Sequence, residues 1–219
     1  LEREMKAKRL VEVERDWNTD LQKVYESEPK RTRTHVSDLT WCLRQSALSR
    51  IHKPNWTPVT LYRFTMGRAM ENVFFSNLMP NATQEMEVES DGIVGHIDFG
   101  SDPVDYECKL TWGKEPDEDD IQGWFENSKG YWLTQAGAYT HMRGRTTMNF
   151  VICFVSFIPR IRCYEVSWDK EELQDMWDKL IDAKEYLDFK DALGELPMKT
   201  LDTYKCKSCQ FKEACDESE

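Results

Sequence analysis

Two patterns of apolar and polar positions divide the chain into helices and strands. Five segments have helical spacing or a helix-forming composition: 3–27, 39–51, 59–78, 121–142 and 169–192. Five shorter segments alternate or are continuously apolar, as strands are: 83–90, 93–100, 104–112, 148–157 and 162–168. We expect Ser37 or Asp38 to cap the second helix. Asp91-Gly92 is a strong turn signal between the first two strands.

The order of these elements predicts the fold class. Helices come first, three antiparallel strands follow, and the last strands lie between two long helices. This order indicates an α/β fold in which a mixed sheet is flanked by helices. We expect four regions: an N-terminal helical segment 1–35, a helical region 36–80, a core with the sheet 81–195 and a cysteine-rich tail 196–219.

Composition and charge narrow the classes of partner. The chain has 219 residues and a formal net charge of −11, which argues against a surface that is basic throughout. Lysines and arginines still gather in 30–53 and in 143–162, where they form either a local basic groove or ordinary solvated surface. The longest apolar run, 149–158, is shorter than the roughly 20 residues of a membrane span. With no signal-peptide pattern at the start, we expect a cytoplasmic protein without membrane partners.

The segment 95–109, GHIDFGSDPVDYECK, carries the candidate chemistry. Side chains alternate along a strand, so Glu107 and Lys109 share one face, and Asp98 can meet Glu107 from the neighbouring strand. Two close carboxylates repel each other unless a cation lies between them, and oxygen ligands suit Mg²⁺ or Mn²⁺. We therefore predict a metal site with the carbonyl of Cys108 as a further ligand. Lys109 would orient or deprotonate a water, or neutralise a phosphate. The alternative is a charged surface hairpin.

The cysteines suggest a second centre. Seven cysteines are an odd number and fit a disulfide framework poorly. Cys206, Cys209 and Cys215 form a C-x2-C-x5-C pattern, and Cys42 is the candidate for a fourth ligand. Four thiolates serve either tetrahedral zinc or an iron–sulfur cluster, and the spacing does not decide between them.

These motifs together resemble a known family. GHIDFG…DYECK is similar to the core of the PD-(D/E)xK nucleases, and QAGAY resembles the Q-x3-Y motif of their RecB-type branch. With SDLTWCLRQ and the cysteine tail, the chain from about 36 to 215 resembles the CRISPR-associated RecB-type exonucleases that carry a 4Fe–4S cluster. The resemblance implies a restriction-endonuclease-like core and such a cluster on the four cysteines. It also implies a metal-dependent DNA exonuclease that acts on single-stranded DNA or overhangs. Such an enzyme would trim prespacer ends in CRISPR adaptation, alongside integrase proteins.

The resemblance also implies roles for individual residues. Asp98 and Glu107 would be metal ligands, and Lys109 would be the catalytic lysine. Gln135 and Tyr139 would lie one helical turn apart and face the active site or the DNA backbone.

One position departs from the family pattern. The family has a histidine ligand in a G-x3-H motif, whereas GRAME places Glu71 there. We expect Glu71 to act as a metal ligand instead. His96 is a second candidate, against its interpretation as an ordinary histidine. Arg44 and Arg50 belong to the first basic group, and we expect them to bind DNA together with Tyr139.

Several alternatives stay open. The aromatic residues Trp41, Trp56, Tyr62 and Phe64 either stack on the bases of a single strand or pack inside the protein. Other functions compatible with the sequence are a non-catalytic DNA-binding or adaptor protein with a decayed metal site, a stand-alone or viral repair nuclease, and a zinc-stabilised interaction module. A homo-oligomer is also left open.

Overall fold

A computed structural model describes residues 11–27, 31–199, 206–207 and 209–218. The helices are α1 (Val11–Glu26), α2 (Val36–Leu39), α3 (Leu43–Ile51), α4 (Pro58–Ala69), α5 (Ser76–Leu78), α6 (Ile121–Met142), α7 (Lys170–Leu193) and α9 (Lys212–Glu217). A π-helical turn, η1 (Met70–Phe75), joins α4 to α5, and a 3₁₀ turn, η2 (Glu118–Asp120), precedes α6. The strands are β1 (Thr34–His35), β2 (Thr83–Ser90), β3 (Ile93–Gly100), β4 (Tyr106–Thr111), β5 (Thr147–Phe154) and β6 (Arg160–Ser167).

The strands form one mixed six-stranded sheet, as the element order predicts. The strand order is β1-β3-β4-β5-β6, and β2 also pairs with β3. β1 pairs with β3 and β4 pairs with β5 in parallel, and the other pairs are antiparallel. β2 follows β3 over its whole length, whereas β4 pairs with β3 only at Phe99↔Tyr106. The rest of β4 therefore diverges from β3 and follows β5.

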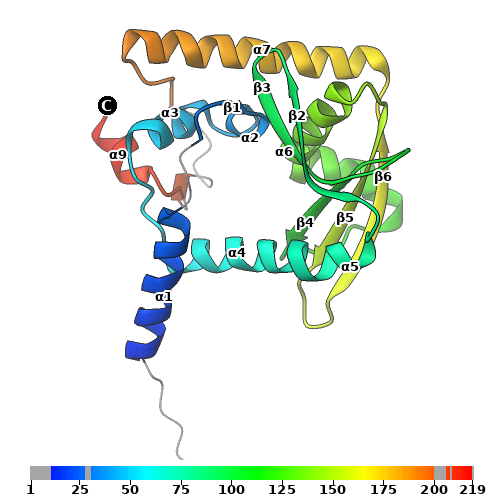
Figure 1. Cartoon of the computed structure of the whole chain (residues 1–219), viewed down its shortest axis with the longest axis horizontal. Coiled ribbons are helices and arrows are strands. Elements are labelled where there is room, and N and C mark those ends of the chain that lie inside the picture. The colour runs from blue at the N-terminus through cyan, green and yellow to red at the C-terminus, as the bar shows by residue number, and fades with distance from the viewer. Residues whose placement is uncertain (1–10, 28–30, 200–205, 208, 219) are drawn as a thin grey trace, which may run out of the picture.

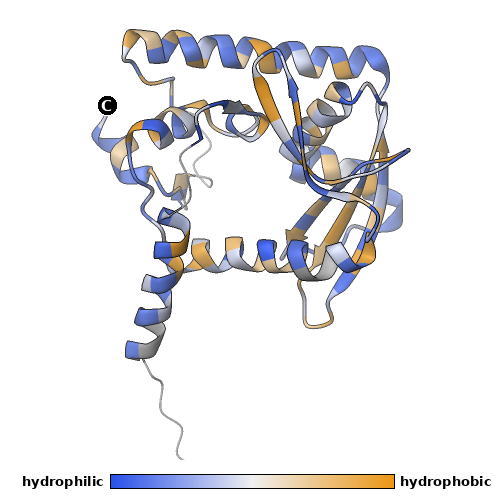
Figure 2. Ribbon diagram, in the orientation of Figure 1, coloured by the Kyte–Doolittle hydropathy of each residue, from blue (hydrophilic) through white to orange (hydrophobic). Residues whose placement is uncertain are grey.

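Helices cover both faces of the sheet. On one face, α2, α6 and α7 enclose the main core, which includes Val36, Ile93, Ile97, Ala136, Met148, Phe150, Ile152, Trp177, Leu180 and Leu187. On the other, Phe99, Val151 and Cys153 pack against Met70 of η1 and Met79. Figure 1 shows α7 and α4 on opposite sides of the molecule with the sheet between them. In Figure 2 the apolar residues are concentrated on the central strands, and α1 is largely hydrophilic.

The helices before the sheet are more broken than the sequence pattern predicts. The predicted helix 39–51 begins earlier as α2, stops at Thr40 and restarts as α3 after Cys42, whose backbone is extended. The expectation that Ser37 or Asp38 caps it is wrong. His35 is the N-cap, and the Asp38 carboxylate accepts a hydrogen bond from the His35 backbone N–H at 2.9 Å. Among the described helices, none combines the length and apolar character needed to cross a membrane.

A buried carboxylate fixes the start of β4. Asp105 is fully buried and accepts a hydrogen bond from the Ser101 N–H at 2.9 Å. It also pairs with Arg143 at 3.1 Å and Arg145 at 3.0 Å, just after α6. A buried charge is tolerated when it is paired and hydrogen-bonded. These bonds tie the entry of β4 to the end of α6, the two elements that carry Glu107, Lys109, Gln135 and Tyr139.

Candidate active site

A small cavity of about 180 Å³ opens where β3, β4, α6 and the end of α4 meet. Its lining consists of Gly67, Glu71, Asp98, Glu107, Cys108, Lys109, Leu110 and Gln135. The predicted metal ligands and the predicted catalytic lysine are therefore neighbours, although they come from three different elements. Only Lys109 among these lining residues carries a positive charge.

Asp98 lies where β3 and β4 separate. One oxygen of its carboxylate accepts a hydrogen bond from the Cys108 backbone N–H at 2.6 Å, in place of a backbone ladder bond. Burial raises the pKa of Asp98 well above its ordinary value, and the negative charge of Glu107 raises it further. Asp98 and Glu107 therefore repel each other when both are ionised, as the sequence pattern predicts.

Glu107 is the most deeply buried carboxylate of the group. Its side chain is 0% exposed, and its Oε1 accepts a hydrogen bond from Lys109 Nζ at 2.5 Å. Its Oε2 is buried and has no hydrogen-bond partner among the described residues. Burial raises the pKa of Glu107, although the positive charge of Lys109 opposes that change. A buried carboxylate oxygen without a partner in a cavity is suited to receive a cation.

Lys109 and Gln135 form the other side of the cavity. Burial alone would lower the pKa of Lys109, but the negative charges of Glu107 and Asp98 outweigh burial and raise it. Lys109 Nζ lies 3.4 Å from Gln135 Oε1, and Gln135 Nε2 donates a hydrogen bond to the Tyr139 hydroxyl at 2.8 Å. Gln135 and Tyr139 thus lie one turn apart on α6 and connect to the lysine, which stays protonated at neutral pH.

Glu71 reaches the cavity from the π-helical turn η1. Burial, a hydrogen bond with Glu85 and the negative charges of Glu85 and Glu107 raise its pKa to about 7. One of its oxygens, Oε1, is buried without a hydrogen-bond partner among the described residues. The structure therefore brings Glu71 to Asp98 and Glu107.

Glu85 is the residue of this group that sequence reasoning missed. Glu71, Glu85 and Asp98 each offer an oxygen atom, and these atoms lie within 4.8 Å of one another. The Asp91-Gly92 turn pairs Ser90 with Ile93, and this register places Glu85 opposite Asp98. Counting back along β2 from the Asp91-Gly92 turn identifies Glu85 as the residue opposite Asp98. Alternation alone does not single out Glu85, because Glu87 and Glu89 follow the same rhythm.

His96 lies apart from the carboxylate group, and the Cys108 thiol packs against apolar residues. His96 stacks on His35 with ring centroids 5.3 Å apart, and its Nε2 lies 3.4 Å from Glu87. It does not line the cavity. The Cys108 thiol packs against the apolar cluster around Phe99, and burial raises its pKa. The proposed role of the Cys108 carbonyl as a ligand stays a prediction.

The four candidate cluster cysteines come from two parts of the chain that are far apart in sequence. Cys42 precedes α3, while Cys206, Cys209 and Cys215 lie in or before α9, which packs on α3. Burial raises the pKa of Cys209, and so do the neighbouring charges of Cys42, Cys206 and Cys215. The Phe211 backbone N–H donates to Cys209 Sγ at 3.4 Å. These thiols therefore lie close enough to influence one another.

The two arginines predicted to bind DNA have partners within the protein. Arg44 is buried, and its guanidinium donates to the backbone carbonyls of Pro197 at 2.9 Å and Ser218 at 3.1 Å. Arg50 pairs with Asp191 of α7 and donates to Thr34 Oγ1 at 3.2 Å. Both side chains hold α3 to other parts of the fold, and their contact with DNA stays a prediction.

The aromatic residues near the basic group contact other rings. Trp41 meets Tyr131 edge-on at 4.6 Å between centroids, and Trp56 meets Phe64 edge-on at 5.5 Å. Phe64 is nevertheless 45% exposed and Tyr62 is 42% exposed. These contacts favour packing for Trp56, and the exposed faces of Tyr62 and Phe64 leave base stacking open.

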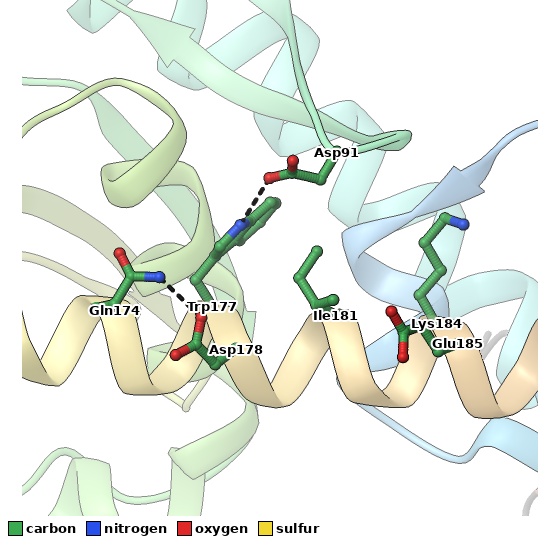
Figure 3. A pocket seen from close by; sticks show the side chains of 7 residues that line it. All are labelled: Asp91, Gln174, Trp177, Asp178, Ile181, Lys184 and Glu185. Atoms are coloured by element: carbon green, nitrogen blue, oxygen red, sulfur yellow. Dashed lines mark hydrogen bonds between the residues drawn. The ribbon is translucent and has the colours of Figure 1, made fainter.

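A larger pocket of about 470 Å³ lies elsewhere, along α7 (Figure 3). There Trp177 Nε1 donates to Asp91 Oδ2 at 3.0 Å, and Gln174 donates to Asp178 at 2.8 Å. Four of its polar lining groups form these two pairs, Lys184 binds Asp188 outside the lining, and the pocket holds none of the predicted site residues. The smaller cavity is therefore the candidate active site, because it combines a charged lysine with buried carboxylate oxygens that have no hydrogen-bond partner among the described residues.

The fold resembles proteins of solved structure. SSO0001 aligns with a TM-score of 0.58 and 17% identity over 97% of this chain and 98% of its own. A phage related exonuclease from Haemophilus somnus 129PT aligns with a TM-score of 0.52 and 16% identity, over 81% of this chain and 95% of its own. The alkaline exonuclease LHK-Exo from Laribacter hongkongensis aligns with a TM-score of 0.50 and 12% identity, over 74% and 91%. No protein-family model and no curated protein matches the sequence. The chain thus has a mixed α/β fold similar to that of exonuclease structures.

Proposed function

We propose that this protein is a nuclease that hydrolyses phosphodiester bonds of DNA with the help of Mg²⁺ or Mn²⁺. The observation that carries the proposal is Glu107. Its carboxylate is fully buried, is bound to Lys109 through one oxygen, and has a second oxygen without a partner among the described residues. It shares a cavity with Asp98 and Glu71. Two exonucleases with the same kind of fold support the reaction class.

The residues present fit a hard divalent cation. Asp98, Glu107 and Glu71 would hold it through carboxylate oxygens, of which Glu107 Oε2 and Glu71 Oε1 are buried without a hydrogen-bond partner among the described residues. A bound Mg²⁺ or Mn²⁺ would supply Lewis-acid polarisation of the phosphate and a lower pKa for a nearby water. Hydrolysis of a phosphodiester adds one water across a P–O bond and leaves a phosphate end and a hydroxyl end.

Lys109 then acts as a charge stabiliser. Its raised pKa keeps the ammonium protonated, so the group is suited to neutralise negative charge that develops on the phosphate. This favours neutralisation over deprotonation of water among the roles that the sequence leaves open. Gln135 lies beside the ammonium and is itself held by Tyr139, so both are positioning residues for Lys109.

A cleavage assay tests this proposal. We expect wild-type protein to degrade end-labelled single-stranded DNA in the presence of Mn²⁺, and Asp98→Asn and Lys109→Met to lose most of this activity. Lys114→Met is the matched control, because Lys114 is an exposed lysine in the loop after β4. Equal cleavage by all four proteins would remove the catalytic assignment. A wild type that binds DNA without cutting it would favour the non-catalytic adaptor.

The finer function rests on the sequence resemblance. We propose an exonuclease that acts on single-stranded DNA or overhangs, with a place in CRISPR adaptation beside integrase proteins. A ladder of products shortened stepwise from one end would support exonucleolytic action. Internal cleavage of a circular single strand would contradict it.

We also propose a 4Fe–4S cluster on the four cysteines. The mutual influence of their thiols and the packing of α9 on α3 support a common centre. Cys42→Ala should bleach the brown colour of the purified protein and lower its iron content. The matched control is Cys163→Ala, since Cys163 is exposed on β6. A colourless wild type with stoichiometric zinc would reject the cluster.

A further inference from the structure

Glu85 has a backbone conformation that a glutamate rarely adopts. Its φ is +51°, in the left-handed region that residues with a Cβ avoid. Its neighbours pair regularly with β3 as Gln84↔Phe99 and Met86↔Ile97, so the distortion is confined to the residue opposite Asp98. Such local distortions persist where the surroundings hold them and are frequent at functional sites.

The distorted residue joins the other carboxyl groups of the site. Oxygens of Glu71, Glu85 and Asp98 lie within 4.8 Å of one another, and Glu71 shares a hydrogen bond with Glu85. Glu85 itself is exposed, so it approaches the group from the solvent side while Asp98 and Glu71 lie deeper. Three carboxylates at this separation repel one another when all are ionised.

A second observation at the same place indicates a missing ligand. Glu107 is fully buried, lines the cavity beside Glu71 and Asp98, and has one oxygen without a hydrogen-bond partner among the described residues. Four carboxylates and one ammonium, that of Lys109, give a formal charge of −4 + 1 = −3 when ionised. With all four carboxylates ionised, the site thus carries an excess of negative charge, which a divalent cation would offset.

We propose that Glu85 is a ligand of the divalent cation, completing a set of carboxylates with Glu71 and Asp98. This rests on the proposed function and deepens it, because it adds a ligand to the same metal centre. A set made of carboxylate oxygens, without imidazole or thiolate, selects Mg²⁺ or Mn²⁺ over softer metals such as Zn²⁺. In this proposal the left-handed backbone conformation of Glu85 directs its carboxylate toward the bound ion.

Binding of Mn²⁺ without DNA tests the proposal independently of cleavage. Isothermal titration calorimetry would compare wild type with Glu85→Gln, Asp98→Asn and Glu89→Gln. We expect Glu85→Gln to weaken Mn²⁺ binding by at least about tenfold. Glu89→Gln is the matched control: Glu89 is also on β2 but pairs with Arg33 at 3.1 Å, and its variant should bind like wild type. Glu85→Asn, which tolerates the left-handed backbone better, should weaken binding as well.

Thermal unfolding supplies a signature that a structural role of Glu85 would not give. Without metal, Glu85→Gln should melt at the wild-type temperature or above, because the variant removes repulsion. With Mn²⁺ its gain in melting temperature should be smaller than that of wild type. A variant that melts lower without metal yet binds Mn²⁺ like wild type would show that Glu85 is structural and would overturn the proposal.

The outcomes also separate this inference from the proposed function. If Glu85→Gln binds Mn²⁺ like wild type while Asp98→Asn binds it weakly, Glu85 is not a ligand and the metal centre stands without it. If Asp98→Asn also binds Mn²⁺ like wild type, both the inference and the proposed metal centre fail.

Discussion

Replacing Glu71 with glutamine should change how the stability of the metal-free protein depends on pH. In the native protein, burial and the bond with Glu85 raise the pKa of Glu71 from 4.5 to about 7. Between these two values the native state keeps the proton that the unfolded chain has already lost. Because the native state binds more protons there, the free energy of unfolding falls as pH rises through this window.

The magnitude follows from the difference in pKa. A difference of about 2.5 corresponds to at most about 3.4 kcal/mol, at about 1.36 kcal/mol for each pKa unit. Glu71 is only partly buried, so solvent screening reduces this value, and we expect about 1–2 kcal/mol. The raised pKa values of Asp98 and Glu107 act in the same direction, so wild type should lose more than this one contribution.

Urea unfolding at pH 5 and at pH 8 in the presence of a chelator measures the effect. Between these pH values Glu71→Gln should lose about 1–2 kcal/mol less stability than wild type. Glu126→Gln, at an exposed position on α6, controls for the removal of one charge and should follow wild type. Identical losses in wild type and Glu71→Gln would refute the electrostatic description of the cavity. Adding Mn²⁺ at pH 8 should restore stability to wild type, since a cation relieves the repulsion.

Three further substitutions test the packing of the fold, near the site and under α7. Gly95→Ala would place a Cβ 2.6 Å from the ring of Tyr139. We expect the free energy of unfolding in urea to fall by about 1–3 kcal/mol and DNA cleavage to become slower. Wild-type values of both would contradict this close approach. Asp105→Ala leaves two arginines near β4 without their buried partner and should cost about 3–5 kcal/mol by the same measurement. Leu187→Ala opens a cavity under α7 and should cost about 2–5 kcal/mol without changing the affinity for Mn²⁺, so a weakened affinity would show coupling to the distant site.

The sequence predicts the sheet better than the helices before it. The Asp91-Gly92 turn and the alternation that follows it set the pairing of β2 with β3, and α6 has the predicted bounds 121–142. β1 was missed, because two residues cannot show an alternation. The break between α2 and α3 was also missed, because residues 39–42 contain neither Gly nor Pro. The break lies at Cys42, whose backbone is extended.

The sequence likewise predicts one part of the candidate site and leaves another part unpredicted. The spacing of Asp98, Glu107 and Lys109 predicts their meeting, since alternation on paired strands determines which side chains share a face. The register of the turn places Glu85 opposite Asp98, but no pattern of residue types specifies its left-handed backbone conformation. Likewise, the interior partners of Arg44 lie more than 150 residues away in the chain, so composition could only place this residue in a basic group.

The buried guanidinium of Arg44 links α3 to the far end of the described chain. Its acceptors are main-chain carbonyls, so their identity does not depend on which side chains occupy positions 197 and 218. Local unfolding that removes the carbonyls of Pro197 and Ser218 would leave the Arg44 guanidinium without these acceptors, at a cost of several kcal/mol. α3, α9 and the residues beside Pro197 should therefore exchange their amide hydrogens with solvent as a single cooperative unit. A protease that cuts near position 197 should loosen α3 and α9 together.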